Sequence, residues 1–244
     1  MLKAVYFDFG GTLMDAESDR RAHLEIIQRV KTRYSLKPSL ELLVRQLEAA
    51  LFAYSPERAR KWIKSEKIIN GFFSQLVGDR LDTRWLWDVY LEAHRTHCEL
   101  FHDAKPTIRA IKGLGLHTGI ISDIDDDYFQ FQTRLFSMDG MFDSITTSDE
   151  VGVGKPNPQI FKIALRKAGC AASESIYIGD SFEKDVVGAK KVGMQTIWYR
   201  GRDSEEADWI VETLSEIPPI IVQLCGRPLF GDSEAKGGQA QTGD

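Results

Sequence analysis

The sequence predicts an α/β fold, in which a parallel sheet is flanked by helices and an all-helical segment is inserted after the first strand. Residues 2–7 form a run that is apolar apart from Lys3, which is typical of a strand covered on both faces. From about residue 18 to residue 100, apolar residues recur at three- and four-residue spacing, which indicates helices packed on one another. After residue 100, helical and strand patterns alternate, which indicates parallel strands joined by right-handed crossovers.

The inserted segment is expected to form a helical cap over the sheet. Ser39, Ser55 (followed by Pro56) and Asp82 are candidate N-cap residues for three of its helices. The chain is therefore predicted to divide into a core (residues 1–15 and 100–225), an all-helical cap domain (16–99) and a polar, Gly-rich tail (226–244) that we expect to be disordered. The predicted cap helices cover residues 20–34, 39–54, 55–77 and 82–100.

The core is expected to continue with alternating helices and strands after residue 100. The predicted helices cover residues 105–115, 125–137, 156–169 and 183–193, and the predicted strands cover residues 117–122, 144–147, 175–180 and 195–199. Residues 207–217 close the run.

Length and composition exclude several classes of protein. A chain of 244 residues suits one large domain or a core with a smaller insert. The net charge of −5 argues against a general nucleic-acid binder, although it allows a small basic pocket for an anion. The three cysteines, Cys98, Cys170 and Cys225, are widely spaced and signal neither a disulfide framework nor a zinc site. The first apolar stretch is too short for a signal peptide or a membrane span. We therefore expect a cytoplasmic protein with neither nucleic-acid nor membrane partners.

Polar side chains follow four of the predicted strands or begin the next element. Because ligands of an open parallel sheet bind beyond the carboxyl ends of its strands, these residues are expected to converge. Asp8 and Asp180 are a reasonable Mg²⁺ site, since Mg²⁺ takes one or two carboxylates, water and substrate phosphate. A serine hydroxyl can donate to an anion and a lysine can neutralise one, so the set suits in-line phosphoryl transfer. The converging residues are Asp8, Ser122, Asp123, Lys155, Asp180 and Asp185.

Four segments in order resemble the motifs of the haloacid dehalogenase superfamily. They are DFGGTL (8–13), the strand end at Ser122, GKPNPQIF (154–161) and GDSFEKD (179–185), and the resemblance covers roughly residues 1–15 and 100–225. It implies a Rossmann-like core, an aspartyl-enzyme intermediate and, as in most such proteins, a Mg²⁺-dependent phosphatase. Carried over by position, it implies Asp8 as the nucleophile, Ser122 as the phosphate-binding hydroxyl, Lys155 as the stabilising lysine, Asp180 and Asp185 as the acidic metal motif, and the carbonyl of Gly10 as a further metal ligand.

Substrate contacts are expected from Gly11, Thr12, Ser122, Asp123 and Lys155. The sequence thus predicts a hydrolase that removes phosphate from a small phosphorylated metabolite. A 2-haloacid dehalogenase and a weakly active phospho-ligand binding protein are the alternatives.

Gly10 departs from the pattern of the family. Phosphatases of the family usually have a second Asp there, which protonates the leaving group and later activates water. Loss of such a group typically costs about 10²–10⁴-fold in rate. Asp15 or Asp123 is a candidate substitute. The dehalogenase branch also lacks the second Asp, but Asp180 and Asp185 argue against a metal-free enzyme.

Two further groups of charged residues are expected to lie mostly on the solvated surface. The run Asp125–Asp127 is interpreted as a solvated helix start. Most cap residues with basic side chains are expected on solvated faces, with Arg58 and Lys64 among the candidates for substrate contact.

Overall fold

A computed structural model describes residues 1–226, so the disorder predicted for the tail concerns residues outside the described part of the chain, Gly226 apart. Within the described part, six parallel strands form one sheet in the order β3-β2-β1-β4-β5-β6. The strands are β1 (Ala4–Phe7), β2 (His117–Ser122), β3 (Ser144–Thr147), β4 (Ser175–Gly179), β5 (Gln195–Tyr199) and β6 (Trp209–Val211). The α/β fold predicted from the sequence is confirmed.

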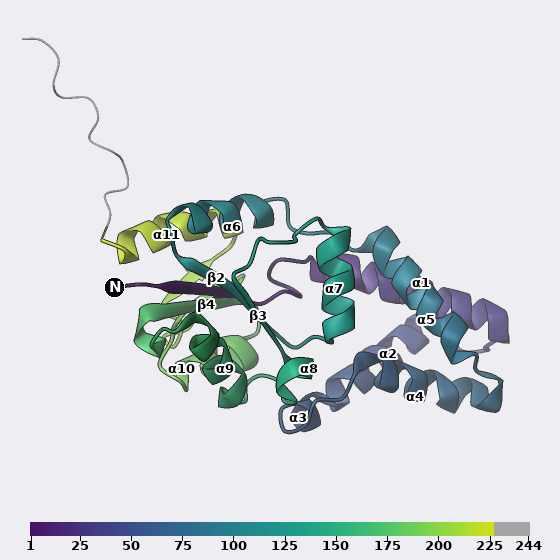
Figure 1. Ribbon diagram of the computed structural model, residues 1–244. Helices are drawn as coiled ribbons and strands as arrows, with labels where there is room; N and C mark the ends of the chain where they lie inside the picture. The colour runs from purple at the N-terminus through teal and green to yellow at the C-terminus, as the bar shows by residue number, and fades with distance from the viewer. Residues whose placement is uncertain (227–244) are drawn as a thin grey trace, which may run out of the picture.

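Helices cover both faces of the sheet (Figure 1). Alternate side chains of β1 enter two cores: Val5 and Phe7 pack with one set of helices, and Ala4 and Tyr6 with the other. α6 (Ala104–Gly113) and α11 (Ile217–Leu224) cover the first face, and α9 (Pro158–Ala168) and α10 (Gly188–Lys190) the second. The remaining core elements are α7 (Asp126–Leu135), α8 (Ser148–Val151), η2 (Ala172–Glu174), η3 (Phe182–Val187) and η4 (Leu214–Glu216).

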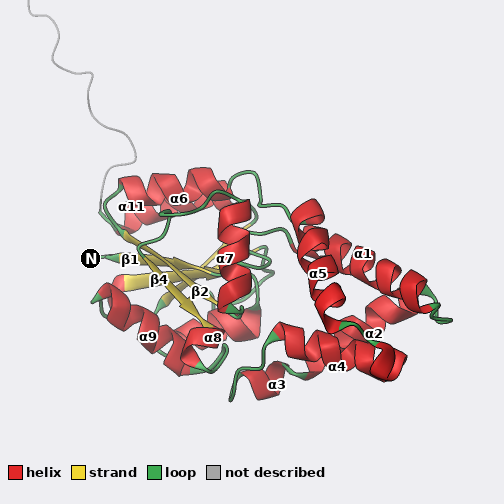
Figure 2. Cartoon of the chain, turned by 45° about the vertical axis from the view of Figure 1, so that its right-hand side comes forward, coloured by secondary structure: helices red, strands yellow, loops and turns green. Residues whose placement is uncertain are grey.

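Five helices between residues 16 and 97, called the cap helices below, lie beyond the carboxyl ends of the strands (Figures 1 and 2). They are α1 (Ala16–Tyr34), α2 (Leu40–Ala53), α3 (Ser55–Arg58), α4 (Ser65–Val77) and α5 (Thr83–His97), with η1 (Gly78–Arg80) before the last. The predicted N-caps Ser39 and Asp82 are confirmed, because their side chains accept from the backbone N–H groups of Leu42 and Trp85 at 3.2 and 3.0 Å.

The two connections between the cap helices and the core run side by side. Asp15 N donates to Glu99 O at 2.9 Å, and Phe101 N donates to Leu13 O at 3.0 Å. The chain therefore leaves and re-enters the core at one place, which we call the hinge (residues 13–15 and 99–101).

Three predicted helices differ from the structure. The helix predicted over 55–77 is broken between α3 and α4, and Tyr54 rather than Ser55 is the N-cap of α3. The break arises because the intervening backbone binds the core instead, with Trp62 N donating to Gly152 O at 2.7 Å. The helix predicted over 183–193 is a π-helical turn (η3) followed by the short α10. α1 begins at Ala16 rather than at residue 20, because Asp15 caps it.

Candidate active site

Asp8 lies where β1 ends, between β2 and β4. The strand order departs from β1 in both directions, so this edge is the switch point at which ligands of such sheets bind. The Asp8 backbone N–H donates to Ile178 O at 2.8 Å, and its carboxylate Oδ1 accepts from Phe9 N at 2.8 Å. These bonds hold a buried carboxylate at the carboxyl edge of the sheet.

Lys155 is buried beside Asp8 and carries its charge into the site. Its ammonium lies 2.9 Å from Asp8 Oδ2 and 2.6 Å from Asp185 Oδ1, and it donates to the Tyr177 hydroxyl at 2.9 Å. Burial opposes the charge, but Asp185, Asp8 and Asp123 outweigh it, so the pKa of Lys155 is raised above its ordinary value. Tyr177 was not anticipated from the sequence; as an aromatic in an apolar strand, it carried no signal beyond core packing.

Three carboxylates gather at the same point. Oxygen atoms of Asp8, Asp180 and Asp185 lie within 4.8 Å of one another. Burial, followed by repulsion from Asp8 and Asp180, raises the pKa of Asp185 to about 7 against the pull of Lys155. Burial and the neighbouring Asp8 likewise raise the pKa of Asp180. Three acids facing one lysine leave an excess of negative charge on hard oxygen donors, and this donor set fits Mg²⁺.

Two glycines make room for these acids. A side chain on Gly11, whose φ is +79°, would place its Cβ 2.5 Å from Asp180 Oδ2. A Cβ on Gly179 would lie 2.4 Å from Asp185 Oδ2. Both positions therefore require glycine for the acids to approach. The role of Gly179 was not anticipated.

The other residues predicted to contact substrate lie in two settings. Ser122, at the end of β2, and Asp123 line the cavity described below. Gly11 and Thr12 are not among the lining residues, and the buried Thr12 hydroxyl donates to Asp180 Oδ1 at 2.9 Å. Asp123 accepts from Ser148 Oγ at 2.7 Å and from Lys155 N at 2.8 Å, so it also fixes the loop that carries Lys155.

The two candidate substitutes for the missing acid are both engaged elsewhere. Asp15 accepts from the N–H groups of Glu17 and Ser18 as the N-cap of α1, and it does not line the cavity. Asp123 is held by the bonds just described. Gly10 is exposed and lines the cavity, its φ is not positive, and a Cβ placed on it would meet nothing within 4 Å. Space for a second carboxylate therefore exists beside Asp8.

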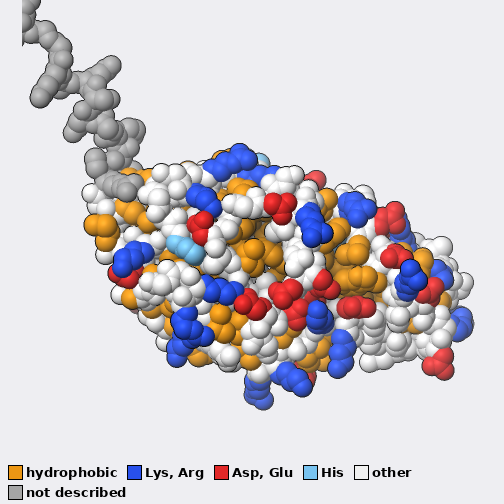
Figure 3. Space-filling view, viewed as in Figure 1, with side chains coloured by type: hydrophobic (Ala, Val, Ile, Leu, Met, Phe, Trp, Pro, Cys, Tyr) orange, Lys and Arg blue, Asp and Glu red, His pale blue; other side chains and the backbone are white. Residues whose placement is uncertain are grey.

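A cavity of about 1060 Å³ lies between the sheet edge and the cap helices. Its core side includes Asp8, Gly10, Ser122, Asp123, Lys155 and Asp180, and its cap side includes Asp19, His23, Leu51, Phe52, Arg58 and Tyr90. On the face shown in Figure 3, acidic side chains gather where the cap helices meet the core, and basic side chains are scattered among acidic and apolar ones. The cavity is large enough for a small metabolite.

Asp125 joins the cap helices to the core, so the interpretation of residues 125–127 as a solvated helix start is wrong for this residue. Asp125 is buried and accepts from Trp62 Nε1 at 2.7 Å and from Ser65 N at 2.8 Å. Burial raises its pKa, against these two bonds and the charge of Arg58. Arg58 stacks on Trp62 with its guanidinium carbon 4.1 Å from the ring centre. Lys64 pairs with Asp149 at 2.9 Å.

No helix among residues 1–226 is both long and apolar enough to cross a membrane.

The fold and the site define a class: a hydrolase with a Rossmann-like α/β core that sets an aspartate, a buried lysine and two further acids at the switch point of a parallel sheet. The model of the haloacid dehalogenase-like hydrolase family matches residues 5–199, and the chain belongs to this family.

Similar proteins include phosphatases and a dehalogenase. The chain is 26% identical over 234 residues to the glyceraldehyde 3-phosphate phosphatase of Methanocaldococcus jannaschii, covering 92% of this chain and 99% of that protein. A crystal structure of a HAD phosphatase from Thermococcus onnurineus has a TM-score of 0.72 at 25% identity, covering 90% of this chain and 98% of that one. A 2-haloacid dehalogenase from Pseudomonas syringae pv. tomato DC3000 shares the fold, with a TM-score of 0.71 at 23% identity over 92% of this chain and 100% of that one.

Proposed function

We propose that the protein is a Mg²⁺-dependent phosphatase of a small phosphorylated sugar, acting through an aspartyl-phosphate on Asp8. The observation that carries this proposal is the group formed by Asp8, Asp180, Asp185 and Lys155 at the switch point of the sheet. A phosphatase of glyceraldehyde 3-phosphate among the similar proteins supports a small sugar phosphate as substrate.

The proposed reaction has two displacements at phosphorus. An oxygen of Asp8 attacks, the bond from phosphorus to the ester oxygen breaks, and the leaving oxygen takes a proton. Water then attacks phosphorus and releases a proton to solvent, the bond to Asp8 breaks, and inorganic phosphate leaves. Lys155 restrains Asp8 through its 2.9 Å contact and offsets the charge of the phosphoryl oxygens, and Ser122 donates to one of them.

The residues that would hold Mg²⁺ are Asp8, Asp180, Asp185 and the carbonyl of Gly10. When bound, the ion supplies positive charge that neutralises the phosphoryl group. Lys155 and Tyr177 keep Asp185 in place by bonds of 2.6 and 3.2 Å to its Oδ1, and Ser181 N donates to its Oδ2 at 2.8 Å. Thr12 does the same for Asp180.

Gly10 shapes the choice of substrate. Without a carboxylate beside Asp8, the leaving oxygen takes its proton from water, so a phosphate on a good leaving group turns over best. The cap helices close one side of the cavity, and we propose that residues 16–99 form a cap domain that selects the substrate and excludes water.

Three free cysteines fit a reducing cytoplasm, which we propose as the location.

A second candidate function is dehalogenation of a 2-haloacid. The absence of an acid at position 10 favours it, because that reaction needs no proton for its leaving halide. The three clustered carboxylates favour the phosphatase, because they suit Mg²⁺, whose charge offsets that of a phosphate, whereas displacement of a halide by a carboxylate needs no metal ion.

A panel of phosphorylated metabolites, assayed with Mg²⁺ and with EDTA beside L-2-chloropropionate, tests the proposal. We expect phosphate release that requires Mg²⁺ and is greatest for sugar phosphates. Chloride release in EDTA would identify a dehalogenase instead. Saturable phosphate binding without turnover of any compound would identify a binding protein.

A further inference from the structure

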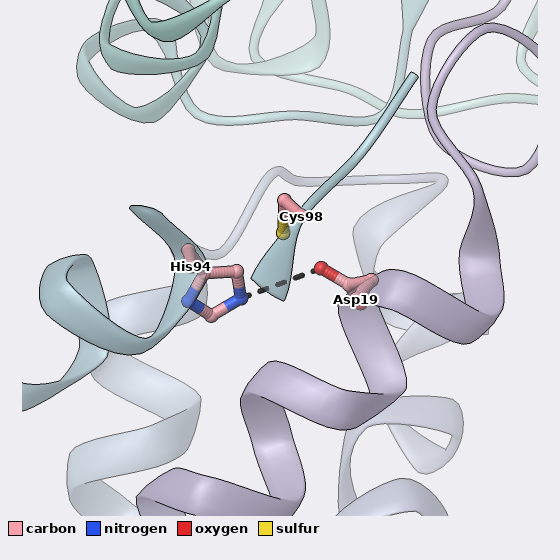
Figure 4. A group of neighbouring side chains, drawn as sticks. All are labelled: Asp19, His94 and Cys98. Atoms are coloured by element: carbon pink, nitrogen blue, oxygen red, sulfur yellow. Dashed lines mark ion pairs between the residues drawn. The ribbon is translucent and has the colours of Figure 1, made fainter. Parts of the chain in front are cut away.

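A cluster of buried polar side chains lies on the cap side of the hinge, separate from the group around Asp8. Asp19 comes from the start of α1, His94 from the end of α5, and Cys98 directly follows α5. Figure 4 shows the Asp19 carboxylate directed at the His94 ring, with the Cys98 sulfur facing the same gap. One ligand atom from each residue lies within 4.8 Å of the other two, and His94 is 0% exposed.

The hydrogen bonding of His94 leaves one ring nitrogen without a partner. Nδ1 lies 2.7 Å from the carbonyl oxygen of Tyr90, which can only accept, so Nδ1 carries the proton. In the neutral ring, Nε2 is then a lone-pair donor. Nε2 has no hydrogen-bond partner, and its 3.3 Å contact with Asp19 Oδ1 lacks the alignment of a hydrogen bond. A buried polar atom without a partner is rare, so a missing ligand is indicated.

The separation of the two atoms suits a shared metal ion. Two ligands bound tetrahedrally to zinc at about 2.0–2.1 Å are about 3.3 Å apart. The distance from Asp19 Oδ1 to His94 Nε2 is 3.3 Å. With the ring neutral, these two acceptors repel each other unless a cation lies between them, and a proton on Nε2 would instead make the contact an ion pair, which the experiment below distinguishes from a metal site.

Neighbouring groups contact the three side chains, as second-layer residues do around the ligands of known metal sites. The Tyr90 carbonyl orients His94, and His23 Nδ1 lies 3.6 Å from Asp19 Oδ2. Gln132 lies beside Cys98, and its buried Oε1 is a second acceptor without a partner. Two of the unpartnered buried atoms among the described residues thus belong to one cluster.

We propose that Asp19, His94 and Cys98 bind a divalent transition-metal ion of the zinc type. Thiolate and imidazole ligands select zinc over magnesium or calcium, whereas the group around Asp8 contains oxygen donors alone. Asp19 also lines the cavity, so water from the cavity can supply a fourth ligand. The ion joins the start of α1 to the end of α5 and so ties the two ends of the cap helices together at the hinge.

Titration of the full-length, chelator-treated chain with Co²⁺ in excess Mg²⁺ tests the proposal, since Mg²⁺ occupies sites made of oxygen alone. We expect one Co²⁺ per chain with a near-ultraviolet thiolate-to-cobalt absorption band. Cys98→Ser should abolish the band, and His94→Gln should weaken Co²⁺ binding about tenfold or more. Zn²⁺ should displace Co²⁺ and raise the melting temperature of the wild type but not of Cys98→Ser.

Cys170→Ser is the matched control. Cys170 is also a free cysteine, but it lies against Tyr6 on the far side of the sheet, so its variant should keep the band. If His94→Gln does not fold, as judged by circular dichroism, Cys98→Ser decides alone. A wild type without the band, or a Cys98→Ser variant that keeps it, would show that the cluster is a buried ion pair with water and would overturn the proposal.

Discussion

At the scale of single residues, the site is a group of carboxylates that repel one another and a lysine whose positive charge holds them together. Asp8 would otherwise be repelled by Asp180 and Asp185, and Lys155 offsets part of that repulsion from a buried position. Removal of any one of these charges therefore changes the pKa values of the others. Substitutions that keep the shape of a side chain are the most informative.

Asp8→Asn keeps the shape and removes the nucleophile. We expect turnover to fall to background while the far-ultraviolet circular dichroism spectrum is unchanged. Lys155 loses one of its two ion-pair partners and keeps Asp185, so a moderate loss of stability, about 1.5–3 kcal/mol, is expected from denaturant unfolding. Near wild-type turnover by a folded Asp8→Asn variant would exclude an aspartyl-phosphate on this residue.

Asp180→Asn should weaken Mg²⁺ binding and turnover together, because one of three candidate carboxylate ligands is lost. Thr12 can still donate to the amide oxygen, so the fold should persist. Calorimetric titration with Mg²⁺ measures the change, and Asp203→Asn, an exposed position away from the site, is the control. An unchanged Mg²⁺ affinity would remove Asp180 from the metal site.

Gly10→Asp restores the proton donor at a position where it fits. The φ of Gly10 is not positive and no atom lies within 4 Å of the added Cβ, so little strain is expected. An alkyl phosphate, with a poor leaving group, should gain about 10²-fold in rate, whereas p-nitrophenyl phosphate should gain little. Gly11→Asp, which would clash with Asp180, serves as the contrasting variant and should lose activity. Equal gains on both substrates would show that proton transfer is not what Gly10 lacks.

At the scale of elements, the segment between α3 and α4 attaches the cap helices to the core. Trp62 and Ser65 both donate to Asp125, and Gly154, next to Lys155, donates its N–H to Arg58 O at 2.7 Å. The same loop that presents Lys155 is thus bonded to the cap helices, so their position and the position of the lysine are linked.

Trp62→Phe removes one donor from the buried Asp125 and leaves the aromatic ring. Loss of a hydrogen bond to a charged group typically costs about 1.5–3 kcal/mol. We expect a lower melting temperature and a KM raised more than kcat is lowered, because the cap helices close less firmly. Trp85→Phe, which lies within the cap helices against Tyr34 and does not line the cavity, should keep the wild-type KM. Identical KM values for both variants would show that the segment between α3 and α4 does not affect substrate binding.

Asp143 gives the stability of the core a defined pH dependence. Burial is the largest single influence and raises its pKa, but the bonds from Lys112 and Thr118 together outweigh it and lower the pKa of Asp143 to about 2. A carboxyl group whose pKa is lower in the folded state than in the unfolded state stabilises the protein at pH values above its unfolded-state pKa. This stabilisation is lost as the pH falls from about 4 towards 2.

Asp143→Asn should therefore destabilise the protein at pH 7 and have little effect near pH 2. The side chain is 37% exposed, so about 1 kcal/mol or less is expected after screening by solvent. Urea unfolding at both pH values measures the difference, with the exposed Asp139→Asn as control. A loss of stability that is as large at pH 2 as at pH 7 would contradict the assignment.

At the scale of the whole molecule, features with a local signal were predictable and features that depend on distant partners were not. Strands 117–122, 144–147 and 195–199 match the structure because each is a short run bounded by turns. The residues at strand ends converge because the carboxyl edge of a parallel sheet brings them together. The burial of Asp125 and the break in the helix at 59–64 depend on contacts between segments far apart in the chain. Tyr177 and Asp19 were missed for the same reason.

The paired connections at residues 13–15 and 99–101 bear on how such a protein can change over time. Because both connections lie next to each other at the hinge, the segment between them can be lengthened, shortened or replaced without a change in the register of the strands. Recombination at this one place would exchange the part of the cavity wall that recognises a substrate and leave the strand that carries Asp8 in place, but the new segment would also have to hold the loop that presents Lys155, as Arg58 O does here. New specificities can therefore arise as whole inherited units, provided that each new segment again supplies donors to the buried Asp125.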